Sequence, residues 1–359
     1  MRIMIEIGHP AHVHNFKNMI WNLEKKGHEI KIIAKYKEVS LELLNKYGFD
    51  YDVIGKNYTT LLGKVFGLIV ADYKTYKISR KFRPDIFISR ASPYSAHASR
   101  LIGKPHIAFC DTERAKLNDI LSYPFTDVIC TPVCFKKDLG SKQIRYNGYK
   151  ELAYLHPKYF RPDQSVLDDL GLSKKDRYII LRFISWGAAH DLTLKGINRN
   201  SVINLIKSLE RYGKVIVSSE NKNDRKLESY KVNIPPDKLH SLLFYAQLYI
   251  GEGGTMAVES AVLGTPAIHI ESTFSGRASG YLSGNFTELQ KKYNLLFMFP
   301  DQKDALGKAI EILEDKKSKK KWREKSKKLL KDKIDVTNWM TEFVDKYPDS
   351  FYNYLNGAV

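Results

Sequence analysis

The alternation of short apolar runs with longer periodic segments along residues 1–131 most constrains the fold. Each apolar run is too short for a helix and is bounded by polar or turn residues, as is typical of strands buried in a parallel sheet. The intervening segments are long enough to serve as crossover helices. The predicted strands are 3–7, 29–34, 51–54, 85–89, 106–109 and 127–131, and the predicted helices are 13–26, 39–47, 59–82 and 91–102. This half is therefore predicted to be Rossmann-like.

The same rhythm restarts after residues 156–163, where His-Pro and Arg-Pro dipeptides disfavour a helix. Strands are predicted at 178–184, 214–218, 248–251, 266–270 and 295–299, and helices at 201–212, 235–246, 255–263 and 304–313. We therefore expect an α/β fold of two Rossmann-like domains, residues 1–155 and 156–335, that face each other across a cleft. Residues 336–359 are expected to form a C-terminal helix, with the N-terminal domain as its candidate packing partner.

Composition favours a globular chain and gives no membrane span. Hydrophobic residues make up 43% and charged residues 27% of the 359 residues, which excludes disordered, collagen-like and coiled-coil classes. The longest nearly apolar stretch, residues 61–71, is interrupted by Lys64 and is shorter than the roughly 18 residues that a span needs. Because Glu6 and His9 interrupt the N-terminus where a signal peptide would be apolar, we expect a cytoplasmic protein.

The net charge of +18 is concentrated in one segment. Residues 316–333 contain 11 basic and 2 acidic residues, which gives them half of the total. Trp322, Ser326, Leu329 and Leu330 recur there at helical spacing, so the segment is predicted to be a basic amphipathic helix. It is either a solvated surface helix or a segment attracted to an anionic membrane face. No motif of a nucleic-acid-binding module accompanies it, and no nucleic-acid partner is expected.

A second segment also has two interpretations. The apolar run of residues 61–70 is followed by Lys74, Lys77, Arg80, Lys81 and Arg83. Such a run could lie at the headgroup boundary of an anionic membrane, with the cations held by the lipid phosphates. The alternative is that it forms the core face of a crossover helix.

The most specific stretch is residues 251–266, where a predicted strand ends in a glycine turn before a helix. Backbone N–H groups at Gly253, Gly254 and Thr255 can approach an anion at the helix start. Glu259 lies one turn further and could contact a second part of the same ligand. A diphosphate carrying a polyol fits this arrangement. The alternative is an ordinary strand-to-helix turn, packed tightly at Gly264.

This segment resembles the donor-binding motif of GT-B enzymes. Gly253-Gly254, Glu259 and residues 264–266 fall into register with the corresponding segment of the GlcNAc transferase that forms lipid II. With a one-residue shift the segment is also similar to the diphosphate loop of non-hydrolysing UDP-GlcNAc 2-epimerases. The resemblance implies a GT-B fold and makes Glu259 the ribose ligand. The chain also resembles an uncharacterised prokaryotic family that shares this layout, and membership of that family would imply no activity by itself.

Histidines follow the first predicted strand. His12 falls where the lipid II transferase pattern has the histidine of its Gly-Gly-His loop, so the resemblance implies a catalytic role for it. Pro10 and Ala11 replace the glycines of that loop, which favours contact with acceptor or sugar over phosphate binding. Because His12 and His14 have no carboxylate or cysteine partner nearby in the sequence, no metal is expected. A structural role for these histidines is the alternative.

An acidic pair follows the fifth predicted strand. Asp111 and Glu113 could position an acceptor hydroxyl or act as general base. The alternative is that Asp111 caps the next helix.

Two further loops supply candidates for the sugar-nucleotide site. Arg182, Ser185, Trp186 and His190 come at or after the first strand of the second half, where GT-B enzymes approach the sugar phosphate. Arg277 lies in a polar, glycine-rich segment and could clamp a phosphate, although that segment could equally be a lid without direct contact.

These features predict a metal-independent GT-B glycosyltransferase that needs no cofactor. Its expected donor is a nucleotide-diphospho-sugar with UDP as the favoured nucleotide, and His12 or Glu113 would deprotonate the acceptor. A lipid-linked acceptor and a peripheral position on the inner membrane face fit the two basic segments. The alternatives are a 2-epimerase-like isomerase, which the residues Met256, Ala257 and Val258 in the glycine loop disfavour, and a non-catalytic binder of nucleotide sugars or polyanions.

Overall fold

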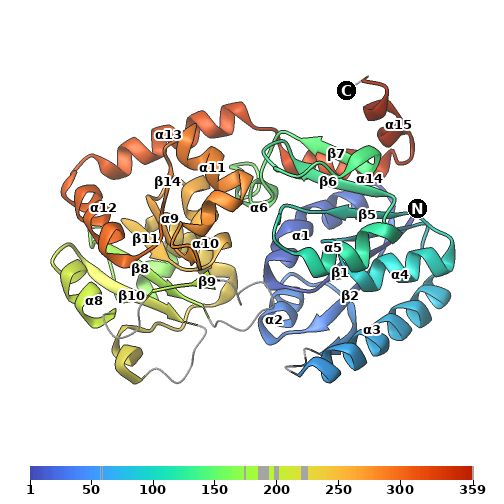
Figure 1. Ribbon diagram of the computed structural model, residues 1–359, viewed down its shortest axis with the longest axis horizontal. Coiled ribbons are helices and arrows are strands. Elements are labelled where there is room, and N and C mark those ends of the chain that lie inside the picture. Colours follow the sequence, from blue (N-terminus) through green and yellow to red (C-terminus); the bar gives the residue numbers. More distant parts are fainter. Residues whose placement is uncertain are drawn as a thin grey trace. The chain divides into compact units, whose positions relative to one another are not determined.

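A computed structural model describes residues 1–56, 58, 60–173, 175–184, 194–197, 202–219 and 225–357 (Figure 1). The chain divides into two compact units, of which unit 1 comprises Met1–Tyr154 and Ile334–Val359 and unit 2 comprises Leu155–Lys333. Each unit contains its own parallel sheet. Among the described residues, no helix combines the length and apolarity that crossing a membrane requires.

Unit 1 is built on seven parallel strands in the order β3-β2-β1-β4-β5-β6-β7. The strands are β1 (Arg2–Ile7), β2 (Glu29–Tyr36), β3 (Tyr51–Lys56), β4 (Ile86–Ser89), β5 (His106–Phe109), β6 (Val128–Pro132) and β7 (Gln143–Tyr146). The chain order reverses between β1 and β4. In open α/β sheets such a reversal opens a crevice at the carboxyl ends of the strands, where ligands bind.

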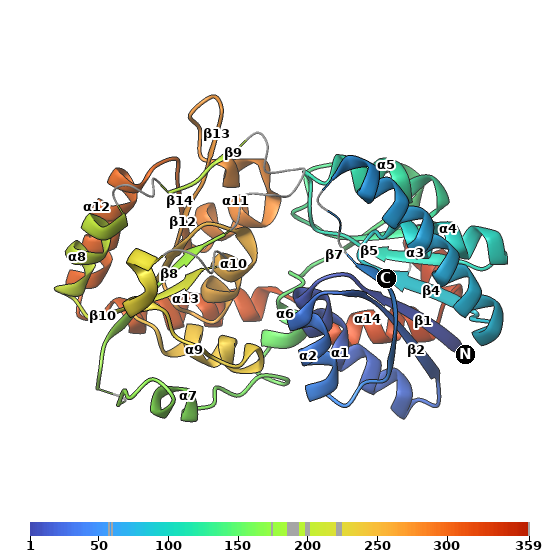
Figure 2. The same ribbon diagram turned by 90° about the horizontal axis from the view of Figure 1, so that it is seen from below.

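Helices cover both faces of this sheet (Figure 2). One layer is formed by α1 (Pro10–Lys25), α2 (Glu38–Lys46) and α14 (Val336–Asp345), and the other by α3 (Leu61–Phe82), α4 (Pro93–Ile102) and α5 (Lys116–Ser122). Short elements complete the unit: α6 (Leu152–Leu155) at the boundary, η1 (Tyr123–Phe125), η2 (Gly140–Lys142) and α15 (Asp349–Leu355).

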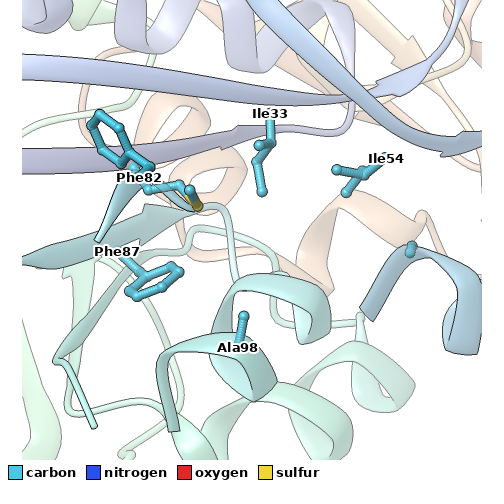
Figure 3. Close-up of a cluster of buried hydrophobic side chains, with 7 residues drawn as sticks. Ile33, Ile54, Phe82, Phe87 and Ala98 are labelled. Carbon is cyan, nitrogen blue, oxygen red and sulfur yellow. The ribbon is translucent and has the colours of Figure 1, made fainter. Parts of the chain in front are cut away.

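The core under α3 and α4 is apolar and closely packed. Ile33, Ile54 and Phe87 point from the strands toward Phe82 of α3 and Ala98 of α4 (Figure 3). Burying such side chains stabilises the fold by about 1.5–3 kcal/mol for each large one. The predicted crossover helices are therefore fixed against the sheet by their apolar residues.

The C-terminal segment forms two helices in unit 1 rather than the single helix that the sequence predicts. Pro348 has no N–H to donate and disfavours helix in the residue before it, so α14 ends at Asp345 and α15 begins at Asp349. Helix α14 packs on α1, where Lys26 pairs with both Glu342 and Asp345 at 2.7 Å.

Unit 2 contains five parallel strands in the order β10-β8-β11-β12-β14. They are β8 (Tyr178–Phe183), β10 (Lys214–Ser219), β11 (Leu248–Gly251), β12 (Ala267–Ile270) and β14 (Leu296–Phe299), and β9 (Leu194–Lys195) pairs antiparallel with β13 (Ser272–Thr273). The order reverses between β8 and β11, which is the flavodoxin-like arrangement and again marks a crevice.

The helices of unit 2 also form two layers (Figure 1). Helices α8 (Val202–Glu210) and α12 (Gln302–Glu314) contact each other on one face, while α9 (Leu239–Tyr245), α10 (Gly254–Val262), α11 (Gly284–Lys291) and α13 (Ser318–Asp332) form a contacting group around α10. The remaining short elements are α7 (Ser165–Asp168), η4 (Arg225–Tyr230), η5 (Pro236–Lys238) and η6 (Ser279–Leu282).

The basic helix α13 uses its apolar stripe inside unit 2. Trp322 donates from Nε1 to the Leu295 carbonyl at 2.9 Å, and Ser326 donates to the Val262 carbonyl at 2.6 Å. Lys319 and Arg323 donate to carbonyls at the C-terminal end of α9, including that of Phe244. The stripe is therefore a packing face and offers no apolar surface to a membrane, while the exposed lysines of α13 remain solvated.

Candidate active site

The turn between β11 and α10 lies at the carboxyl edge of unit 2 where the strand order reverses. Gly253 has a φ of 80°, which only glycine adopts readily, and a Cβ there would come within 3.0 Å of Ile184 Cγ2. Helix α10 begins at the next residue, Gly254. The first N–H groups of a helix have no intrahelical acceptor, so those of Gly254 and Thr255 are available to an anion.

Glu252 holds this turn against the segment that follows β8. Its side chain is fully buried, and its two carboxylate oxygens accept hydrogen bonds from Ile184 N at 2.9 Å and Ile197 N at 2.7 Å. These two backbone donors stabilise the buried negative charge. Sequence reasoning missed Glu252, although an acidic residue directly after an apolar strand was a usable signal.

Glu259 lies on the second turn of α10 and is buried. Its Oε1 is 3.1 Å from Nε2 of His240 on α9. The carboxylate that the resemblance assigns to ribose is thus oriented by a histidine that the sequence did not single out. A lone histidine in an apolar helix gave no signal for that role.

The two arginines predicted in unit 2 differ in their surroundings. Arg182 donates from Nη1 to Ser218 Oγ at 2.8 Å. It also packs against Gly251, because a Cβ built on Gly251 would lie only 2.6 Å from the Cβ of Arg182. It is therefore at the strand reversal. Arg277 is exposed, and its carbonyl closes a turn with Thr273 N at 2.8 Å. Ser185, Trp186 and His190 lie outside the residues that the structure describes.

His12 lies in the first turn of α1, after the end of β1. Gly8 N donates to its Nδ1 at 3.2 Å. Burial lowers the pKa of His12 well below its usual range, and the nearby His9, Arg90 and Lys150 lower it further. The ring is therefore neutral at pH 7, and because Nδ1 accepts a hydrogen bond, its proton is on Nε2.

Asp111 is the centre of a buried charge cluster after β5. Burial alone would raise the pKa of Asp111, but Lys150 and Arg90 lower it well below its usual range. Arg90 forms an ion pair with Asp111, and Lys150 Nζ is 2.6 Å from the other carboxylate oxygen. Asn15 connects α1 to the cluster by donating to the Lys150 carbonyl at 3.2 Å.

This cluster decides between the two interpretations of Asp111. Helix α5 begins at Lys116 and its N-cap is Ala115, so the prediction of Asp111 as a helix cap is wrong. The side chain is instead paired with Arg90 and Lys150, because a buried charge without a partner would be strongly destabilising.

The structure does not bring the carboxylates of Asp111 and Glu113 to a common partner. Glu113 is buried, and its Oε1 accepts from Lys136 N at 3.3 Å in the segment after β6, whereas Asp111 bonds to Arg90 and Lys150. Each carboxylate therefore has its own partners.

Glu6 is a further candidate site residue, and sequence reasoning missed it. It is 2% exposed on β1, and a Cβ built on Gly8 would lie 3.1 Å from its Oε1 and 3.8 Å from His12 Cε1. Both side chains thus flank Gly8. Burial raises the pKa of Glu6 to about 7, against the opposing effects of Ser92 and Lys35. The signal was a glutamate in an otherwise apolar strand.

No group of three His, Cys, Asp or Glu side chains is placed to hold a metal ion within the part of the chain that the structure describes. Unit 2 therefore offers backbone N–H groups to an anion, and unit 1 offers a neutral histidine, a protonatable glutamate and a buried ion-pair cluster. These arrangements are suited to binding a phosphate ester and to moving a proton, respectively.

Comparison with solved structures supports the fold. The S. aureus MnaA structure with UDP is 12% identical with a TM-score of 0.69, and covers 98% of this chain and 97% of that chain. UDP-GlcNAc 2-epimerase from Neisseria meningitidis, bound to UDP-GlcNAc, is 12% identical with a TM-score of 0.65 over 90% and 94% of the chains. The Streptomyces sp. SF2575 glycosyltransferase SsfS6 with thymidine diphosphate is 13% identical with a TM-score of 0.59 over 96% and 99%.

These similarities confirm the prediction of a GT-B fold, shared by glycosyltransferases and UDP-GlcNAc 2-epimerases. An uncharacterized protein of Methanocaldococcus jannaschii is 24% identical over 279 residues, covering 74% of this chain and 80% of that protein. Residues 1–344 match the family described as "Protein of unknown function (DUF354)". The chain therefore belongs to the DUF354 family, and its fold is that of GT-B enzymes.

Proposed function

We propose that this protein is a GT-B enzyme that binds a nucleotide-diphospho-sugar on unit 2 and transfers the sugar to an acceptor. The observation that carries the proposal is the start of α10 at the strand reversal, where the positive φ of Gly253 presents helix N–H groups to an anion. Similar folds have been solved with UDP, UDP-GlcNAc and thymidine diphosphate bound, which supports the ligand class.

Unit 2 would stabilise the leaving diphosphate without a metal ion. The N–H groups at the start of α10 and the positive end of its dipole oppose the charge that develops on the phosphate as the sugar departs. Arg182 at the strand reversal and Arg277 on its exposed turn are the candidate phosphate cations. Glu259 is the candidate ribose ligand, and His240 is a positioning residue that orients its carboxylate.

Unit 1 would supply the groups for the acceptor. His12 is neutral with its proton on Nε2, so it can donate to an acceptor or sugar oxygen without rearrangement. Acting as base at Nε2 would first require the proton to move to Nδ1 and the Gly8 hydrogen bond to break. Glu113 is the second candidate base, and Asp111 would keep Arg90 and Lys150 in place rather than take a proton.

A 2-epimerase is the second candidate, because solved structures with UDP or UDP-GlcNAc resemble this fold at TM-scores of 0.69 and 0.65. Such an isomerase would need acid–base groups but no acceptor. Glu252 stands in the glycine turn, but its two oxygens are occupied by backbone N–H groups, which disfavours it as that acid or base.

Thermal unfolding in the presence of UDP, GDP, dTDP or CMP tests the nucleotide site, because a ligand of the native state raises the midpoint. We expect a nucleoside diphosphate to stabilise the protein and Glu259→Ala to weaken its binding by roughly 1–3 kcal/mol in calorimetric titration. Stabilisation by none of them would contradict the proposal.

Product analysis then separates the candidate reactions. Incubation with the corresponding nucleotide sugar alone should leave it unchanged if the protein is a transferase, whereas an epimerase would convert it. Sugar transfer should appear only when an acceptor is added. Tight binding with no turnover under any condition would instead identify a non-catalytic binder.

A further inference from the structure

Over residues 62–81, helix α3 buries small residues and exposes several large apolar ones, while Phe82 at its end joins the core. The buried residues of this stretch are Gly67, Ala71, Thr75 and Ser79. Its exposed residues include Leu62, Val65, Phe66, Ile69 and Tyr73, which we call the α3 stripe, with exposed fractions of 84% at Leu62 and 62% at Ile69. Helical spacing places these five on one face. The run is therefore not simply the core face of a crossover helix.

The α3 stripe continues into positive charge along the same helix. Lys77 and Arg80 follow it at helical spacing, with Lys74 and Lys81 beside them, and all four are exposed. Asp72 is the acidic residue of α3, and its Oδ2 is 2.9 Å from Nδ1 of His97 on α4. The outer face therefore combines an apolar half with a basic half.

The helix layer that contains α3 exposes further apolar residues. His97 also contacts the Leu121 carbonyl of α5 at 2.9 Å through Nε2, so α4 connects α3 and α5 in one layer (Figure 2). Helix α5 exposes Leu117 and Ile120. Isolated exposed apolar residues are ordinary on protein surfaces, but apolar groups gathered on one layer indicate an interaction.

The chemistry of this surface fits an anionic bilayer. Large apolar side chains can enter the boundary between headgroups and acyl chains, a tyrosine next to them suits the headgroup level, and cations attract anionic lipids. A protein partner would need a complementary surface of about 800 Å² per side, whereas a fluid bilayer needs no complementary shape.

We propose that α3 docks this protein on anionic lipid membranes, with the α3 stripe at the acyl boundary and Lys77 and Arg80 on the headgroups. The apolar and the electrostatic contributions are both needed, because either one alone gives only marginal attachment to a membrane. This docking does not depend on the nucleotide site, and it would bring unit 1 close to an acceptor carried by a lipid.

Co-sedimentation with vesicles tests the proposal. Phosphatidylcholine vesicles with about 30% phosphatidylglycerol should bind the protein at low salt, while vesicles of phosphatidylcholine alone should bind it weakly. The double variant Phe66→Glu/Ile69→Glu should bind at least about tenfold more weakly, since it removes apolar contacts and adds repulsion. Leu355→Glu on α15 is the matched control, an exposed leucine that should tolerate the same charge without loss of vesicle binding.

A second pair of variants separates α3 from the basic helix α13. Lys77→Glu/Arg80→Glu should weaken binding, whereas Lys320→Glu/Lys328→Glu, which changes the charge equally on α13, should retain most of it. The other substituted residues are exposed, namely Lys77, Arg80, Lys320, Lys328 and Leu355. Thermal melting followed by circular dichroism verifies that each variant is folded. Loss of binding in the α13 variant with retention in both α3 variants would overturn the proposal, as would wild-type protein that stays in the supernatant with anionic vesicles at low salt.

Discussion

At the scale of single residues, the contribution of Glu6 to the stability of the fold depends on pH. Its carboxyl is buried beside Gly8 and His12, and Lys35 is the cation that acts on it from β2. Because burial raises the pKa of Glu6 to about 7, the folded protein holds this proton more tightly than the unfolded chain does. The associated stability is present below about pH 4.5 and is lost as the pH rises toward 7.

Glu6→Gln should therefore be more stable than the wild type at pH 8 but not at pH 4.5. The gain should reach about 3 kcal/mol, the free energy that separates a pKa near 7 from that of an ordinary glutamate. Urea unfolding across this pH range measures it, and the exposed Glu42→Gln on α2 serves as control. A constant difference between Glu6→Gln and wild type at all pH values would show that Glu6 does not titrate in this range.

His12 should separate turnover from nucleotide binding. We expect His12→Ala to keep nucleotide affinity and to lower turnover by roughly 10²–10⁴-fold, as for loss of a group that acts in proton transfer or hydrogen bonding at the reacting atoms. Single-turnover kinetics beside a binding curve measure both quantities. Equal loss of both would mean that His12 is structural or contacts the nucleotide.

The tautomer of His12 predicts which substitution is tolerated. Because the proton is on Nε2, a glutamine amide can replace the donor, so His12→Gln should retain more turnover than His12→Ala. If His12→Gln is as slow as His12→Ala, the imidazole acts as a base and must change tautomer during the reaction.

At the scale of elements, the turn before α10 should not tolerate a side chain. Gly253→Ala meets both a positive φ and Ile184 at 3.0 Å, so it should destabilise the protein by about 1–3 kcal/mol and weaken nucleotide binding. Gly307→Ala in α12 is the matched control, since a Cβ built on Gly307 meets no neighbouring atom within 4 Å. This substitution should stabilise the protein by about 0.5–1 kcal/mol. Thermal unfolding with and without nucleotide distinguishes the two. Unchanged stability and affinity in Gly253→Ala would contradict a fitted anion turn.

The sequence predicts the sheet strands well where an apolar run is bounded by turns. The strand predicted at residues 106–109 is β5, and the one at 248–251 is β11. The edge strand β7 was missed, because Gln143 and Arg145 break its apolar pattern, and β9 and β13 are two-residue strands that carry no pattern. The sequence left two interpretations of α3 open, because periodicity cannot tell which face of a helix the sheet covers.

At the scale of the whole molecule, the candidate sites depend on strand order, which a single sequence does not contain. The cluster of Arg90, Asp111 and Lys150 comes from loops after three strands. The sequence marked Asp111 as a candidate but gave no sign of Arg90 or Lys150. The glycine turn at Gly253 could be predicted because its chemistry is local. Contacts between distant segments, such as that of His240 with Glu259, required the structure.

The assignment of the nucleotide to unit 2 makes a prediction for the full chain. Phosphate bound at the start of α10 would hold the N–H groups of Gly254 and Thr255 and stabilise the elements around them. Hydrogen exchange in peptides covering residues 251–259 should slow with the nucleotide that stabilises the protein, by up to about 100-fold at a ligand concentration 100 times the dissociation constant. Peptides covering residues 8–15 of unit 1 should change little without an acceptor.

The corresponding nucleoside, which lacks phosphate, is the control ligand and should give little protection at residues 251–259. Because both ligands share the base and ribose, the difference between them reports the phosphate contact with α10 alone. Protection from exchange that appears first at residues 8–15, or that is equal for nucleoside and nucleotide, would contradict an anion site at Gly253. The helix start would then be a structural turn, and its glycines would be explained by the closeness of Ile184 and Phe286 alone.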